Sequence, residues 1–96
     1  MILHTVNSSP LSTFSLHDCL KQLDDNDILL LISDGVIAAS ATIEQQPTLL
    51  KLHESQRLFV LRDDLVARGL DVKVGEIIDY PAFVDLTIQC KSQLAW

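Results

Sequence analysis

The chain has 96 residues, 48% of them hydrophobic, and thirteen Asp and Glu against seven Lys and Arg give a formal net charge of −6. One domain over residues 1–96 is expected, and so small a globule either has an unusually dense core or, as we expect, is partly covered by a partner. The seven basic residues are scattered, which excludes the Lys and Arg clusters that bind a nucleic-acid backbone, so no direct nucleic-acid binding is expected.

The first elements along the chain are a strand and a helix. Residues 2–6 are a short β-branched run ended by the turn formers "NSSP", which predicts a strand. Apolar residues then recur at helical spacing: Leu16, Cys19, Leu20 and Leu23. Ser12 or Ser15 is the candidate helix cap, and Ser15 with Asp18 three residues later fits a capping box.

The run "DILLLI" at 27–32 is apolar without alternation. Such a strand is covered on both faces, which favours a parallel sheet with helices above and below it. "SDG" follows the run, and "VIAAS" is expected to open a short helix. Residues 44–48, "EQQPT", are expected to form a loop, and "LLKLHES" at most two helical turns.

The C-terminal half continues the alternation of strands and helices. A third strand is predicted at 57–61, "RLFVL", and "RDDLVARGL" suits a helix that ends at Gly69. A fourth strand is centred on Ile77 and Ile78. Pro81 fits the first turn of a last helix, "AFVDLTIQC", and "SQLAW" is a candidate fifth strand. The order predicts a three-layer α/β/α sandwich with a mainly parallel sheet of four to five strands.

Ligands of such a sheet bind outside the carboxyl ends of its strands. That rim is expected to hold four segments: Asn7 to Pro10, Ser33 to Val36, Arg62 to Asp64, and Asp79 to Pro81. "SDGV" at 33–36 can present N–H groups to an anion. A single glycine and the negative charge of Asp34 favour instead a turn with a helix cap.

Cys19 and Cys90 have no partner at metal-ligand or C-x-x-C spacing. Cys19 lies on or beside the apolar stripe of its helix, where a free cysteine commonly acts as a small hydrophobe, and Asp18 opposes the thiolate. A buried structural role is therefore favoured over a reactive thiol by the local sequence. Cys90 shares a helix face with Phe83 and Leu86, which favours a structural role more strongly.

The remaining polar residues give no catalytic arrangement. His4, His17 and His53 lie in three different elements, so neither a metal site nor a Ser–His–Asp arrangement is expected, and no cofactor is. Asp24, Asp25 and Asp27 are interpreted as a solvated turn. Together with three acids in later turns they also resemble the acidic pocket of a receiver domain, for which no suitable lysine follows "EIID". The terminal Trp96 is expected to pack either on its own sheet or on a neighbouring subunit.

No stretch of the sequence predicts export or membrane insertion. The start "MILHTVNSSP" lacks the basic region and long apolar run of a signal peptide, and the longest apolar run, "ILLLI", is too short to cross a bilayer. A cytoplasmic location is the expectation.

The segments "ILHTVNSSP", "DGVIAAS", "LRDDLVARGL", "DYPAFVDLT" and the terminal "AW" occur in an order and spacing that resemble the TusB/DsrH family. The resemblance covers nearly the whole chain and is weakest over residues 40–55. It implies the DsrE-like α/β sandwich. In the TusB branch it implies a small subunit that assembles with TusC-like and TusD-like chains into a heterohexamer. That complex relays persulfide sulfur, through a TusE-like acceptor, toward 2-thiolation of the wobble uridine in tRNA.

In the DsrH branch the resemblance implies DsrE-like and DsrF-like partners and a role in dissimilatory sulfur oxidation. DsrH proteins carry a cysteine in the first helix, and "SLHDCLK" places Cys19 in that pattern, so Cys19 becomes a candidate sulfur carrier or redox thiol. The principal sulfur-accepting cysteine of these complexes lies on another subunit. The resemblance therefore implies an accessory subunit of a sulfurtransferase complex and not an autonomous enzyme.

Overall fold

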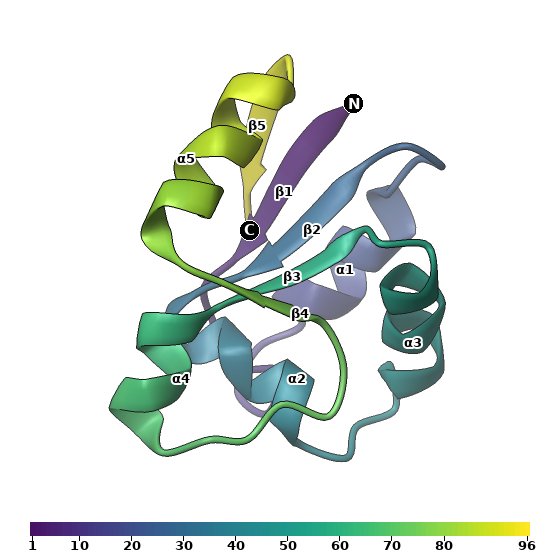
Figure 1. Cartoon of the computed structure of the whole chain (residues 1–96). Helices are drawn as coiled ribbons and strands as arrows, with labels where there is room; N and C mark the ends of the chain where they lie inside the picture. Colours follow the sequence, from purple (N-terminus) through teal and green to yellow (C-terminus); the bar gives the residue numbers. More distant parts are fainter.

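The computed structural model describes residues 1–96 and is built on a sheet of five parallel strands in the order β4-β3-β2-β1-β5 (Figure 1). In chain order the strands are β1 (Ile2–Val6), β2 (Ile28–Leu31), β3 (Leu58–Leu61), β4 (Glu76–Ile78) and β5 (Ser92–Ala95). The helices are α1 (Ser15–Gln22), the 3-10 helix η1 (Ser33–Val36), α2 (Ile37–Ser40), α3 (Gln46–Glu54), α4 (Arg62–Arg68) and α5 (Tyr80–Gln89). The predicted parallel α/β sandwich is confirmed, and its sheet has the upper number of expected strands.

The central strand β2 is buried along its whole length, as its continuous apolar run predicts. It pairs on one side with β1, where Leu3 lies opposite Ile28, and on the other with β3, where Leu29 lies opposite Leu58. The last strand, β5, pairs with the first, β1, at an edge of the sheet. The two termini of the chain therefore lie in neighbouring strands.

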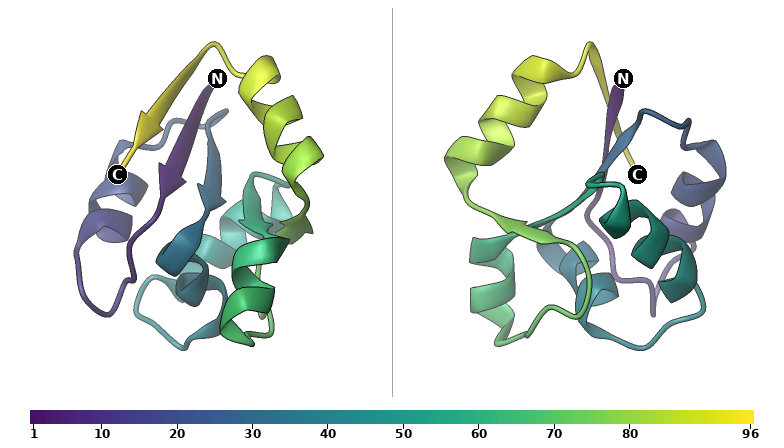
Figure 2. Two further views of the ribbon diagram at one scale, coloured as in Figure 1. Left: turned by 90° about the vertical axis from the view of Figure 1, so that its left-hand side faces the viewer. Right: turned by 45° about the vertical axis from the view of Figure 1, so that its right-hand side comes forward.

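Successive side chains of each strand point to opposite sides of the sheet, so two separate cores form. On the α1–α3 face, strand residues pack against α1, α2 and α3, and Leu65 of α4 joins them; these strand residues are Val6, Leu29, Leu31, Leu58 and Val60. On the α5 face, strand residues pack against Leu86 of α5 and the adjoining Cys90; these are Leu3, Ile28, Leu30 and Ile78. Figure 2 shows α5 on the side of the sheet opposite α1 and α3.

Two predictions about helix starts are wrong. Ser15 is already the first residue of α1, the cap position is Phe14, and no side chain caps the helix. The N–H of Asp18 donates to the carbonyl of Phe14, so the proposed capping box between Ser15 and Asp18 does not form. Residues 44–48 are not wholly a loop either, because α3 begins at Gln46 with Pro47 in its first turn. A proline there needs no N–H partner and has a suitable φ, which a search for helix breakers overlooks.

Two other boundaries are confirmed. Helix α4 ends at Gly69, which adopts the left-handed conformation with φ of 62°. Helix α5 has Pro81 in its first turn, and the side chain of Asp79 accepts a hydrogen bond from the Ala82 N–H at 3.0 Å. This cap satisfies one of the free N–H groups of the first turn of α5.

Candidate functional site

The carboxyl edge of the sheet brings together two of the four predicted rim segments through side-chain bonds. The N–H of Ser33 donates to Oδ2 of Asp64 at 2.7 Å, and Arg68 forms an ion pair with Asp34 at 2.9 Å. Arg68 also donates to the main-chain oxygen of Asp64. The carboxylates of the rim are thus engaged with groups of the chain itself.

The glycine of "SDGV" serves packing. A Cβ atom at Gly35 would overlap the carbonyl oxygen of Val6 at the end of β1, so only glycine allows η1 to lie against that strand. The Ser33 N–H, which an anion would need, already has the Asp64 carboxylate as its acceptor. Residues 33–36 form a short 3-10 helix that continues into α2, and no side chain caps it. The observed bonds favour a structural turn here.

A buried polar network lies at the opposite, amino end of β2. Nε2 of His4 is 2.9 Å from Oδ2 of Asp27, and the N–H groups of Ile2 and Asp24 donate to the same carboxylate at 2.9 and 3.1 Å. Both His4 and Asp27 are almost fully buried. The interpretation of Asp27 as part of a solvated turn is therefore wrong, whereas Asp24 and Asp25 are exposed as expected.

The last residue of the chain completes this network. The indole N–H of Trp96 donates to Nδ1 of His4 at 3.0 Å, and the main-chain N–H of Trp96 donates to the carbonyl of Thr5 at 2.9 Å. Because an indole is only a donor, Nδ1 of His4 must be the acceptor, and the ring carries its proton on Nε2, toward Asp27. Trp96 thus packs on its own sheet, which is the first of the two predicted alternatives.

The Asp27 carboxylate is stabilised by its donors. Burial acts to raise the pKa of Asp27, but the hydrogen bonds from His4, Asp24 and Ile2 bring that pKa below its ordinary value. The network therefore keeps a charged acceptor inside the fold, where it holds β1, β5 and the turn before β2 together.

Cys19, the candidate sulfur carrier, lies in the core of the α1–α3 face with no exposed surface. Burial, and then the negative charge of Asp27, raise the pKa of the Cys19 thiol to about 12. The thiolate is the nucleophile in sulfur transfer, so in this conformation Cys19 is a neutral apolar residue. A sulfur-carrying role of Cys19 remains a prediction, and it requires a movement of α1 that exposes the thiol.

Cys90 lies in the other core, on the α5 face of the sheet. Burial raises the pKa of the Cys90 thiol; the nearby N-terminal ammonium partly offsets this rise, and Asp27 adds slightly to it. The sheet separates the two cysteines, which are both free. Sulfur therefore has no direct route between them within this chain.

The other candidate ligands are dispersed. Nδ1 of His53 accepts the N–H of Gly75, and His17 is exposed on α1. No group of three His, Cys, Asp or Glu side chains is arranged so that it could hold a metal ion. The acids that resemble a receiver pocket are split between the two ends of the sheet, because Asp27 precedes β2 whereas Asp34 and Asp64 follow β2 and β3.

The feature that the sequence reasoning missed is a surface on α5. Tyr80, Val84 and Ile88 are spaced by four residues, and their side chains are 55%, 49% and 76% exposed. We call these three residues the α5 stripe. The available signal was the composition of α5, "YPAFVDLTIQ", which contains a single charged residue. Attention to the inner face, with Phe83, Leu86 and Cys90, concealed the apolar outer face.

Comparisons with known proteins agree on one family. The family described as "DsrH like protein" matches residues 8–93. The proteins named Protein TusB from Yersinia pestis (strain Pestoides F) and from Yersinia pseudotuberculosis (serotype O:1b, strain IP 31758) are each 41% identical to this chain over 99 residues. Each alignment covers 99% of this chain and 100% of the relative.

A solved structure shows the same fold. The crystal structure of the ychN protein from E. coli superposes with a TM-score of 0.75 at 18% identity, over 99% of this chain and 97% of that one. Among the helices of this chain, none has the length and apolar character needed to cross a membrane.

Proposed function

The chain belongs to the TusB/DsrH family, and from this premise we propose that it is one subunit of a heterohexameric sulfur-relay complex. In this proposal TusC-like and TusD-like chains complete the complex, which passes persulfide sulfur by way of a TusE-like acceptor toward 2-thiolation of the tRNA wobble uridine. The chain acts in the cytoplasm as one DsrE-like domain over residues 1–96. The observation that carries the proposal is the full-length 41% identity to proteins named TusB.

Two physical features support a role in protein contacts. The α5 stripe is an apolar surface that no part of the chain covers, and such surfaces mark interaction sites. The formal charge of −6 disfavours direct binding of the tRNA backbone by this chain, so another component of the pathway binds the RNA. The chain then contributes by completing the complex and shaping the surface on which sulfur donors and acceptors dock.

The test is a gene deletion with complementation. A strain that lacks this chain is expected to lose 2-thiouridine from its tRNA, as measured by mass spectrometry of digested tRNA, and a plasmid copy of the chain is expected to restore it. The variant Cys19→Ser is expected to restore it as well if the chain acts only through its contacts. Unchanged thiolation in the deletion strain would contradict the proposal.

The second candidate is a DsrH-like subunit, with DsrE-like and DsrF-like partners, that serves dissimilatory sulfur oxidation. The observation that favours it is the match to the family described as DsrH-like. In this branch Cys19 carries sulfur: its thiolate attacks the terminal sulfur of a donor persulfide, a new S–S bond forms on Cys19, and the donor leaves as a thiolate. The raised pKa of Cys19 then means that transfer is slow until the thiol is exposed.

Intact-mass spectrometry separates the two candidates. The assembled complex is incubated with a small-molecule persulfide, and a gain of one sulfur atom on this chain is measured in the wild type, Cys19→Ser and Cys90→Ser. An adduct that disappears only in Cys19→Ser supports the carrier role. An adduct that survives in Cys19→Ser but disappears in Cys90→Ser contradicts the assignment to Cys19.

A further inference from the structure

Helix α5 has an outer surface that is unusual for a helix exposed to water. Residues at i, i+4 and i+8 of a helix lie on one side of it, so the α5 stripe of Tyr80, Val84 and Ile88 forms one line along the helix. The ring of Tyr80 also contacts the half-buried ring of Phe83, with centroids 5.6 Å apart. The stripe therefore continues into the edge of the core on the α5 face.

The inner side of α5 is apolar as well, since Leu86 packs on the sheet. A helix that is apolar on both sides is normally buried on both sides. Val66, the large exposed apolar residue of α4, differs from the stripe because Arg62 and Asp63, four and three positions before it, are polar. A single exposed residue needs no explanation, whereas a continuous line of three indicates a contact surface.

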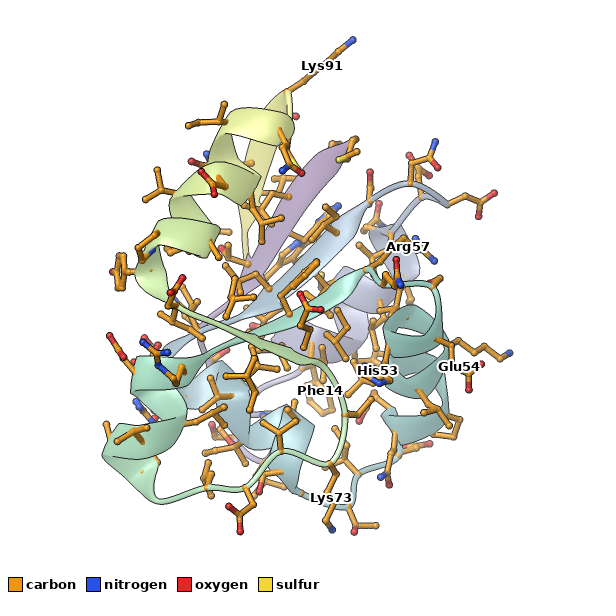
Figure 3. All side chains as sticks on the ribbon, in the orientation of Figure 1. Phe14, His53, Glu54, Arg57, Lys73 and Lys91 are labelled. Carbon is orange, nitrogen blue, oxygen red and sulfur yellow. The ribbon has the colours of Figure 1, made fainter.

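The charge on α5 is concentrated at one point beside the stripe. Asp85 is the single charged residue of the helix, it is exposed, and it has no basic group within ion-pair distance. The next basic residue along the chain, Lys91, projects away beyond the end of α5 (Figure 3). The stripe thus presents an apolar line with one unpaired negative charge next to its middle residue, Val84.

This charge bears on what covers the stripe. Asp85 lies at the flank of the stripe, so in a two-fold contact between two copies whose α5 helices cross antiparallel near Val84, both Asp85 carboxylates would lie on the same side of the contact. Two like charges at an interface that excludes water are unfavourable, and each copy already carries a net charge of −6. A different chain with a cationic group at that place has no such repulsion.

The size of the stripe also indicates a larger contact. Its three side chains expose on the order of 300 Å², whereas a stable interface buries about 800 Å² on each partner. The stripe is therefore the apolar centre of a contact that extends over neighbouring surface. Aromatic and aliphatic side chains at the centre of an interface contribute most of the affinity.

We propose that the α5 stripe is the surface by which this chain docks on a different protein subunit, one whose apolar surface carries a Lys or Arg opposite Asp85. The inference rests on the proposed function, because it takes the partner to be another subunit of the sulfur-relay complex. To that function the inference adds the surface of this chain that makes the contact and the positive charge that the partner carries opposite it.

The experiment co-expresses tagged chain with the TusC-like and TusD-like chains of the same genome and measures the yield of the complex by size exclusion. Ile88→Glu and Asp85→Lys are expected to lower the apparent affinity by about tenfold or more, because each places an unmatched charge in a dry contact. Val66→Glu is the matched control, equally exposed and apolar but outside the stripe, and is expected to leave assembly unchanged. Thermal melting of each isolated variant checks that the fold is intact.

Each outcome is decisive. A wild-type chain that captures neither partner contradicts the proposed function, and the inference falls with it. Capture by the wild type that persists undiminished in Ile88→Glu contradicts the inference alone. Loss of assembly in Val66→Glu with retention in Ile88→Glu places the contact on α4. Self-association of the isolated wild type that Ile88→Glu abolishes identifies a second copy as the occupant and also contradicts the inference.

Discussion

On the α1–α3 face of the sheet, a core of 14 buried residues receives side chains from four helices and η1, whereas on the α5 face a core of six buried residues lies beneath one helix. The first face leaves its helices with polar outer surfaces for the most part. The second face is covered by a helix whose outer side is itself apolar. The difference indicates that one face stabilises the isolated chain and that the other is completed by another molecule.

The largest expected effect compares one leucine from each core. Leu29→Ala on the α1–α3 face removes a fully buried side chain from the larger core and is expected to lower the free energy of unfolding by about 2–5 kcal/mol. Leu86→Ala on α5 is expected to cost about 2 kcal/mol or less, because the thinner layer can relax into the space. Urea unfolding of both variants, followed by circular dichroism, gives the comparison. Equal losses would show that both faces stabilise the chain alike.

The next largest effect is expected in the buried polar network around Asp27, because this network ties β1 and β5 to the turn before β2. Asp27→Asn weakens three hydrogen bonds to a buried group and is expected to cost about 1–3 kcal/mol. The pKa of Asp27 in the folded chain is below its ordinary value of 3.8, so its contribution is complete above 3.8 and is lost as the pH falls through the folded pKa.

The advantage of the wild type over Asp27→Asn should therefore be largest near neutral pH and shrink below 3.8. Urea unfolding between neutral and strongly acidic pH measures it. Asp25→Asn is the matched control, since Asp25 is exposed in the same turn, and it should leave the pH dependence unchanged. An advantage that grows on acidification would contradict the proposed charge state of Asp27.

A smaller effect is expected at the C-terminus. Trp96→Phe keeps an aromatic ring beside His4 but removes the indole donor to Nδ1, which is expected to cost about 1 kcal/mol. Trp96 is the only tryptophan of the chain, so its fluorescence in the wild type reports directly on β5. We expect the fluorescence and circular dichroism transitions to coincide. A fluorescence transition at lower urea would show that β5 detaches before the rest unfolds.

The smallest effect on the free energy of unfolding is expected on the outer side of α5, in contrast to Leu86 on its inner side. Ile88→Ser changes an exposed residue of the α5 stripe and is expected to alter the free energy of unfolding by less than about 0.5 kcal/mol, although a large apolar side chain is removed. Thermal or urea unfolding of the isolated chain measures this. A loss comparable to that of Leu86→Ala would mean that Ile88 belongs to the chain's own core.

The sequence predicts most of the fold because its strongest signals are local. The unbroken run at 27–32 predicts a strand buried on both faces, and Gly69 and Pro81 mark helix boundaries that depend only on φ and on a missing N–H. The cap at Ser15 could not be predicted reliably. The cap is the residue just before the first helical residue, so its position depends on where the preceding turn ends. Here the turn at Ser9 to Thr13 is followed by Phe14, which occupies the cap position.

The polar network is less predictable, because its partners meet only in the assembled sheet. Asp27 looks like one acid among several in "DDND", and its partner His4 is 23 residues away in the neighbouring strand. Their contact depends on the register that sets His4 opposite Leu29. Helical spacing did predict that Cys19 lies on a buried stripe, but the rise in its pKa depends on complete burial and on the charge of Asp27.

The pairing of β1 with β5 has a consequence for how the protein is made. The strand that closes this edge is the last of the five to be synthesised, so β1 keeps an open edge until residues 92–95 have left the ribosome. That edge is closed by contacts from both strands, because the Ile2 N–H of β1 donates to Asp27 and the Trp96 indole after β5 donates to His4.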